Sequence, residues 1–263
     1  MATTCPSNFD VTKLRERVSS VYTRVARDPG GDFHFHRGAE YAIRLLGYDP
    51  TELEGVPERA KARFAGVGNP LAIGPIAPGE TVLDHACGAG MDLLLAARRS
   101  GPAGKAIGVD ATPAMTECAA ASAREARLES RVEIRDGSFE ELPVDDASID
   151  VVISNGVLNL APDKRRVLRE VFRVLRPGGR LYLADVVVQR ELSLAARSNP
   201  ELWAACVGGA LPEPELTTLS ADAGLLEGRI HARFRSFADT SAETKVSRDL
   251  EIGAVNFFAR KPF

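Results

Sequence analysis

The sequence has few cysteines and little net charge. It contains 263 residues with four cysteines and a formal charge of -3, and its calculated pI is about 5.9. The cysteines show no paired spacing typical of a metal site, and so we expect no metal centre. The near-neutral charge gives no reason to expect binding to nucleic acid or to an anionic membrane surface.

Long hydrophobic runs are also missing from the sequence. No stretch of eighteen consecutive apolar residues occurs, and residues 1–6 are not followed by the apolar core of a signal peptide. We therefore expect a cytoplasmic protein without a membrane segment. In that reducing compartment, structural disulfides between the four cysteines are not expected.

Turn signals divide the chain into a cap and a larger α/β region. Residues 1–75 show helical periodicity interrupted by turn clusters, which predicts a helical cap without a core of its own. From residue 76 to 263, predicted strands alternate with helices, the pattern of a parallel sheet covered on both faces. Helices are expected over 113–126 and 163–175, each following an early proline. Residues 228–237 and 254–260 are expected to form an antiparallel pair that completes a seven-stranded sheet.

The most informative motif is the segment 81–92, which reads TVLDHACGAGMD. A short apolar strand reaches Asp84, a turn follows with Gly88 and Gly90, and a helix-forming run comes next. Glycines in such a turn let backbone N–H groups approach a ligand at a helix N-terminus. The segment therefore predicts a nucleoside site.

A second predicted strand refines the identity of that nucleoside. It ends at Asp110, twenty residues beyond Gly90, where a carboxylate can accept hydrogen bonds from both ribose hydroxyls. The dinucleotide fingerprint requires a small residue three positions after Gly90, and this chain has Leu93 there. The pattern disfavours a nicotinamide cofactor and favours an adenosine ligand without the pyrophosphate, of which S-adenosylmethionine is the common example.

These motifs resemble those of class I S-adenosylmethionine-dependent methyltransferases. The first motif of that family, an acid followed by small residues and glycines at alternating positions, is matched by Asp84, Ala86, Gly88 and Gly90, with alanine at one usual glycine position. Residues 136–139 resemble the loop that reaches the adenine, and residues 175–181 resemble the turn before the fifth strand. The resemblance covers roughly residues 80–190 and implies a Rossmann-like seven-stranded fold with S-adenosylmethionine as cofactor.

Three further segments resemble arsenite methyltransferases, namely residues 64–70, 153–164 and 202–211. Those enzymes hold trivalent arsenic with cysteine thiolates, which are soft donors suited to a thiophilic centre. Their motifs place one cysteine in each segment. Only Cys206 is present in this chain, because the first position is Gly66 or Val67 and the second is Gly156.

The resemblance and the predicted strand ends together imply a set of cofactor-binding residues. They are Tyr22, Asn69, Asp84, Ala86, Gly88, Gly90, Asp110, Ala111, Thr112, Met115, Ser138, Phe139, Asn155 and Val157. Asp84 is expected to order the glycine turn and bind the methionine ammonium, and Asp110 to bind the ribose. Met115 and Phe139 are expected to cover the adenine, while Thr112 either contacts the ribose or caps the next helix.

Three residues are candidates for catalysis, namely His36, Asn155 and Cys206. Asn155 follows a predicted strand and is expected beneath the sulfonium, with a plain turn residue as the alternative. His36 or its neighbour His34 is a candidate general base, because imidazole titrates near neutrality, although surface histidines are common. The family resemblance places Cys206 at the acceptor pocket. Tyr22 either reaches the cofactor carboxylate or packs at a helix interface.

The sequence thus predicts S-adenosylmethionine-dependent methyl transfer to a small-molecule acceptor, by a monomer or a homodimer. Two alternatives stay open. One is an arsenite or organoarsenical methyltransferase that uses Cys206 with Cys5 or an external thiol. The other is a protein that binds S-adenosylmethionine without catalysis.

Overall fold

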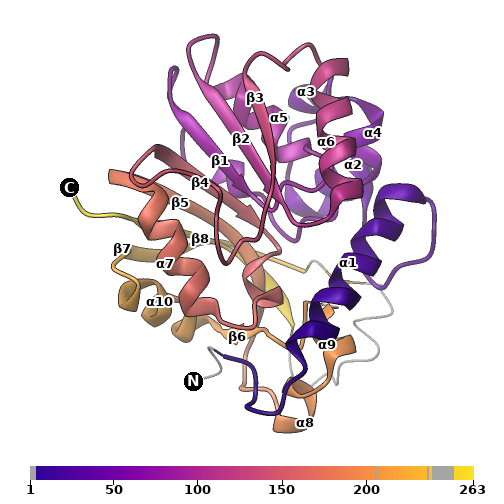
Figure 1. The fold of residues 1–263 in the computed structure, drawn as a ribbon, viewed down its shortest axis with the longest axis vertical. Coiled ribbons are helices and arrows are strands. Elements are labelled where there is room, and N and C mark those ends of the chain that lie inside the picture. Colours follow the sequence, from indigo (N-terminus) through magenta and orange to yellow (C-terminus); the bar gives the residue numbers. More distant parts are fainter. Residues whose placement is uncertain (1–3, 205, 236, 239–251) are drawn as a thin grey trace.

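The computed structural model describes residues 4–204, 206–235, 237–238 and 252–263, and one twisted sheet runs through it (Figure 1). The strands are β1 (Thr81–His85), β2 (Lys105–Asp110), β3 (Val132–Asp136), β4 (Ile149–Asn155), β5 (Leu175–Val188), β6 (Leu211–Pro212), β7 (Leu226–Phe234) and β8 (Gly253–Arg260). Their order is β3-β2-β1-β4-β5-β8-β7, and the short β6 pairs with β5. β8 runs antiparallel to β5 and β7, whereas the other pairs are parallel. The predicted fold class and its antiparallel end are confirmed, with β6 as an added edge piece.

The helices fall into a cap group and a group that connects the strands. The cap holds α1 (Val11–Arg27), α2 (Gly38–Leu46), α3 (Pro50–Leu53), α4 (Glu58–Ala62) and the 3-10 turn Pro70–Ala72. The connecting helices are α5 (Met91–Arg99), α6 (Pro113–Glu125), α7 (Lys164–Val174), α8 (Leu194–Arg197), α9 (Pro200–Ala204) and α10 (Glu213–Asp222), with a 3-10 turn at Leu158–Leu160. The helices predicted after the two prolines are therefore confirmed as α6 and α7.

Alternating side chains divide the strands between two cores. Val82 of β1 packs with α5 and the cap helices, whereas its neighbour Leu83 packs with α7 and α10. Successive strand residues point to opposite faces of a sheet, so an uninterrupted apolar strand must be covered on both sides. Figure 1 shows this arrangement, with α7 and α10 on one face of the sheet and α5, α6 and α2–α4 on the other.

The cap shares its core with the sheet. Tyr41, Leu46 and Val56 of the cap belong to one buried cluster with Val82 and Leu94 of the α/β region. The helix α1 lies against α6 and α9, two helices that are distant from it in the sequence. The short cap helices thus bury their apolar side chains against the sheet layer, which positions them over the carboxyl ends of the parallel strands.

The turn between β1 and α5 combines a left-handed backbone with a close helix–strand contact. Ala86, Gly88 and Gly90 have φ values of 70°, 52° and 93°. Leu93 occupies the position that is small in dinucleotide-binding proteins, yet α5 still packs on β2. Gly108 of β2 makes this contact feasible, because a Cβ atom there would lie 2.6 Å from Leu93 Cδ2. In this protein the small residue at the helix–strand contact is therefore Gly108 on the strand, whereas dinucleotide-binding proteins have it on the helix.

None of the helices in the described part of the chain has the length and apolar character that a membrane crossing requires.

Candidate functional site

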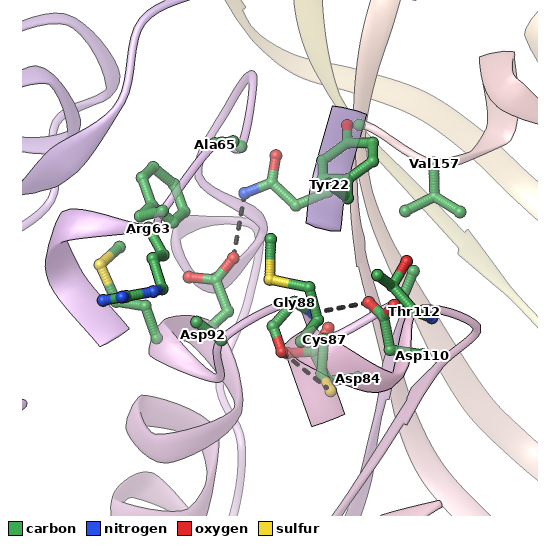
Figure 2. Close-up of a pocket in the computed structure, with 18 of the residues that line it drawn as sticks. Tyr22, Arg63, Ala65, Asp84, Cys87, Gly88, Asp92, Asp110, Thr112 and Val157 are labelled. Carbon is green, nitrogen blue, oxygen red and sulfur yellow. Dashed lines mark hydrogen bonds between the residues drawn. The ribbon is translucent and has the colours of Figure 1, made fainter. Parts of the chain in front are cut away.

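A pocket lies at the carboxyl ends of β1, β2 and β4, beneath the cap (Figure 2). Its empty volume is about 810 Å³, including the part that opens to solvent. The α/β region contributes residues 84, 86–89, 91–92, 110–112, 115, 139, 155–157 and 160, and the cap contributes residues 18, 22, 60 and 63–66. Ligands of open α/β sheets bind at this edge, where the strand order reverses.

Asp110 holds the glycine turn in place. Its Oδ2 accepts a hydrogen bond from the Gly88 N–H at 2.9 Å, and its Oδ1 accepts one from the Thr112 N–H at 2.9 Å. Burial raises the pKa of Asp110, while these hydrogen bonds lower it. Asp110 from the next strand therefore bonds to Gly88, while Asp84 bonds to the Leu93 N–H just after the turn.

Asp84 presents an uncompensated carboxylate to the pocket. The residue is 3% exposed, and among the described residues its Oδ2 has no hydrogen-bond partner. Burial and the neighbouring Asp92 and Asp110 raise its pKa well above the usual range, while the Leu93 N–H lowers it. Buried polar atoms are nearly always paired in folded proteins, so this oxygen is suited to a ligand that brings a positive charge.

The amide of Asn155 is the centre of a buried network. Its Oδ1 accepts hydrogen bonds from the backbone N–H groups of Val67 (2.8 Å) and Gly68 (3.2 Å), and its Nδ2 donates to Asp92 Oδ2 (3.0 Å). Tyr48 in turn donates to Asp92 Oδ1 at 2.7 Å. Asn155 thus ties the cap segment at 66–68 to the floor of the pocket, a role distinct from a plain turn residue.

Sequence reasoning did not identify Asp92 and Tyr48 as members of this network. Asp92 lies within the quoted turn motif, but an acid in the first turn of a helix is a common feature of helix N-termini. Tyr48 carries no local signal, since its partner is 44 residues away in the chain. Arg63, which also lines the pocket, was missed for the same reason.

Most of the predicted cofactor-binding residues line one pocket. Those that do are Tyr22, Asp84, Ala86, Gly88, Asp110, Ala111, Thr112, Met115, Phe139, Asn155 and Val157. Three others lie outside its lining. Gly90 begins α5, Ser138 accepts a hydrogen bond from the Glu140 N–H, and Asn69 exchanges backbone hydrogen bonds with the Asn256 side chain.

The three segments where arsenite methyltransferases place cysteines meet at one wall of the pocket, where Gly66 and Gly156 line the pocket and Val67 and Cys206 do not. Val67 and Cys206 belong to one apolar cluster, and a Cβ atom on Gly156 would lie 3.6 Å from Val67 Cγ1. Cys206 Sγ donates to the Gly156 carbonyl at 3.8 Å. The described structure thus places a single thiol at this point and fills the remaining space with the Val67 side chain.

Cys206 is buried away from the ligand space. Tyr22 and Gly156, which both hydrogen-bond to it, line the pocket, whereas Cys206 does not. Burial and the nearby Asp185 raise the pKa of the Cys206 thiol to about 12. It therefore stays protonated at neutral pH, while soft-metal coordination requires a thiolate. Tyr22 hydrogen-bonds with this thiol and also lines the pocket, so its expected contact with a cofactor carboxylate stays a prediction.

The other candidates for acid–base or thiol chemistry lie outside the pocket lining. His36 Nε2 is 2.7 Å from the Ala238 carbonyl oxygen, and its ring stacks on Tyr41 with a centroid distance of 5.0 Å. Cys5 bonds through its backbone N–H to the Pro162 carbonyl, and burial raises the pKa of its thiol. Within the described ranges, no group of three His, Cys, Asp or Glu residues could hold a metal ion.

Comparison with known proteins gives a consistent result. A family model described as a methyltransferase domain matches residues 76–231. An arsenite methyltransferase from Halobacterium salinarum is 40% identical over 220 residues, which cover 82% of this chain and 55% of that protein. The chain therefore spans about half the length of this curated relative.

Solved structures extend the likeness to the whole fold. A crystal structure of an arsenic(III) S-adenosylmethionine methyltransferase from Chlamydomonas reinhardtii matches with a TM-score of 0.64 and 34% identity, covering 81% of this chain and 72% of that one. A geranyl diphosphate C-methyltransferase from Streptomyces coelicolor matches with a TM-score of 0.63 over 94% of this chain and 97% of that one. At 19% identity, the second match shows a shared fold alone.

Proposed function

The chain belongs to the family of methyltransferase domains, and from this premise we propose that it transfers a methyl group from S-adenosylmethionine to a small-molecule acceptor. The observation that carries the proposal is the unpaired Oδ2 of Asp84 in the pocket beside the glycine turn. A buried carboxylate with no cation among the described residues matches a ligand that brings its own positive charge.

The pocket contains residues suited to each part of the proposed cofactor. Asp84 would bind the ammonium group, and the free lone pairs of Asp110 would accept the ribose hydroxyls. Met115 and Phe139, which also line the pocket, would supply apolar surface for the adenine. When bound, S-adenosylmethionine would supply an electrophilic methyl group, which an acceptor nucleophile would attack in line with the S–CH3 bond while neutral S-adenosylhomocysteine leaves.

The chain's own contribution to catalysis would be positioning and exclusion of water. Asn155 anchors the cap segment at 66–68, and Val18 and Tyr22 of α1 cover the pocket from above. Holding two reactants in the attack geometry inside a dry site accelerates a displacement without an acid or base. The described lining contains no histidine, which supports an acceptor that is nucleophilic without help from His36.

An arsenite or organoarsenical acceptor is the second candidate, favoured by the 40% identical relative. The site argues for a weak reaction at most. Val67 and Gly156 bring no thiol, the Cys206 thiol is buried and protonated, and Cys5 lies outside the pocket lining. Arsenic would then depend on thiols supplied from solution.

Calorimetry with S-adenosylhomocysteine tests the proposed cofactor. We expect a dissociation constant on the order of micromolar, about -8 kcal/mol, and no detectable heat with NAD or NADP. Binding of a nicotinamide cofactor in place of S-adenosylhomocysteine would overturn the proposal. Binding without methyl transfer across a panel of thiols, amines, phenols and thiol-complexed arsenite would favour a non-catalytic binding protein.

Cellular location and assembly stay predictions. The cytoplasm, and a monomer or homodimer, are the expectations from the sequence. Fractionation of tagged protein and light scattering would check them.

A further inference from the structure

The pocket lining carries one positive charge among several negative ones. Asp84, Asp92 and Asp110 are acidic, and Arg63 of the cap is the only lysine or arginine among the described lining residues. S-adenosylmethionine carries the opposite set, with a sulfonium and an ammonium balanced by one carboxylate. Arg63, the single cation in an otherwise acidic lining, therefore has one partner of opposite charge on this ligand, the carboxylate.

The backbone holds Arg63 in place without neutralising it. Its Nε donates to the Ala26 carbonyl at 2.6 Å, and its Nη1 donates to the Arg59 carbonyl at 3.1 Å. Ala26 lies in the last turn of α1, where carbonyl groups favour a cation. Between described residues, no ion pair includes Arg63. The guanidinium is thus oriented, and its charge is available to a ligand.

Arg63 lies at the end of the pocket opposite Asp110 and Thr112. Figure 2 shows Arg63 at one end and Thr112 with Asp110 at the other, with Gly88 and Cys87 between them. If Asp110 binds the ribose, the amino-acid part of the ligand extends along the glycine turn toward Arg63. Tyr22, the residue expected from the sequence to reach the carboxylate, hydrogen-bonds with Cys206.

We propose that Arg63 binds the α-carboxylate of S-adenosylmethionine and so selects ligands with an intact amino acid. This inference rests on the proposed function. An arginine suits the task because its planar fork donates two parallel hydrogen bonds to a carboxylate. Arg63 and Asp84 would then recognise the two charged groups of the same amino acid, one from the cap and one from β1. The cap would therefore contribute affinity as well as cover.

The test compares two ligands that differ only in the carboxylate. Binding of S-adenosylhomocysteine and of its decarboxylated analogue, which keeps the amine, is measured by calorimetry for wild type and Arg63→Met. We expect Arg63→Met to weaken S-adenosylhomocysteine by about tenfold or more and to leave the analogue within about twofold of wild type. Arg63→Lys should fall between the two, since it keeps the charge but loses the fork.

Arg59→Met is the matched control. Arg59 is an exposed cation one turn earlier on the same helix and does not line the pocket, so its loss should leave both ligands unaffected. Equal weakening of both ligands by Arg63→Met would assign Arg63 a structural role and overturn the inference, as would no weakening of either. If Arg63→Met does not fold, equal affinity of wild type for the two ligands overturns it. Failure of wild type to bind either ligand would instead contradict the proposed function.

Discussion

The two sides of the pocket differ in how their polar groups are used. Along the glycine turn, Asp84 and Asp110 are buried acids whose oxygens either order the backbone or face the ligand space. At the wall formed by Gly156, Val157 and Leu160, the neighbouring thiol of Cys206 is buried and turned to backbone and Tyr22. The glycine-turn side thus carries buried acids suited to a charged ligand, whereas the other wall lines the pocket without a thiol. Likeness to arsenite methyltransferases is therefore stronger evidence for the cofactor than for the acceptor.

The largest expected effect is on the cofactor side. Asp110→Ala removes the acceptor of the Gly88 and Thr112 N–H groups together with the proposed ribose contact. We expect calorimetry to show S-adenosylhomocysteine binding weakened by about 1.5–3 kcal/mol, the scale of a charge-assisted hydrogen bond. The control is Asp136→Ala, because Asp136 pairs with Asp110 in register at the end of β3 but lies outside the pocket lining. An unchanged affinity in Asp110→Ala would remove Asp110 from the site.

A second experiment asks whether the floor of the pocket depends on Asn155. Asn155→Leu keeps the side-chain size but removes the acceptor of the Val67 and Gly68 N–H groups and the donor to Asp92 Oδ2. We expect the free energy of unfolding, measured with urea, to fall by about 1–3 kcal/mol. Tyr48→Phe removes only one hydroxyl and should cost about 0.5–1.5 kcal/mol. Equal stability of Asn155→Leu and wild type would mean that the network does not hold the segment at 66–68.

The neighbouring buried acids Asp84 and Asp92 predict that the affinity for S-adenosylhomocysteine depends on pH. Burial raises the pKa of Asp92 to about 6, although hydrogen bonds from Asn155 and Tyr48 and the charge of Arg99 lower it. Burial and the charges of Asp92 and Asp110 raise the pKa of Asp84. An ammonium group favours the ionised acids, so S-adenosylhomocysteine should bind most tightly above this range and weaken as the pH falls through it. The loss should approach tenfold per pH unit for one displaced proton.

5′-Methylthioadenosine is the control for that pH series, because it lacks the amino acid and should bind with little change between about pH 5 and 8. The same pH slope for both ligands would place the titrating group at the ribose or adenine and contradict the assignment of Asp84.

The smallest effect is expected on the acceptor side. Cys206→Ser should change S-adenosylhomocysteine affinity by less than about 0.5 kcal/mol, because Cys206 lies behind the pocket wall. Arsenite incubated with a physiological thiol should yield little methylarsenite in either protein. Robust methylarsenite formation that disappears in Cys206→Ser would reverse the comparison and make the metalloid the acceptor.

Local sequence patterns were enough to predict the frame of the site. The apolar strands that carry Asp84 and Asp110 near their ends, the glycines between them, and the prolines at the start of α6 and just before α7 all act on backbone within a few residues of themselves. Backbone geometry there follows from residue type, because glycine permits positive φ and proline sets the first turn of a helix. The carboxyl ends of parallel strands then meet at one edge, whatever the remaining side chains do.

The partners of the functional side chains depended on packing between distant segments. Asp110 rather than Asp84 bonds to Gly88, Asn155 bonds to a loop 88 residues earlier, and Cys206 turns to Gly156 instead of the pocket. Arg63 enters the site because α4 packs on the sheet layer near α6. A hydrogen bond forms only when donor and acceptor lie at the right distance and angle. For segments far apart in the sequence, these are set by the tertiary fold and cannot be read from the spacing of residues along the chain.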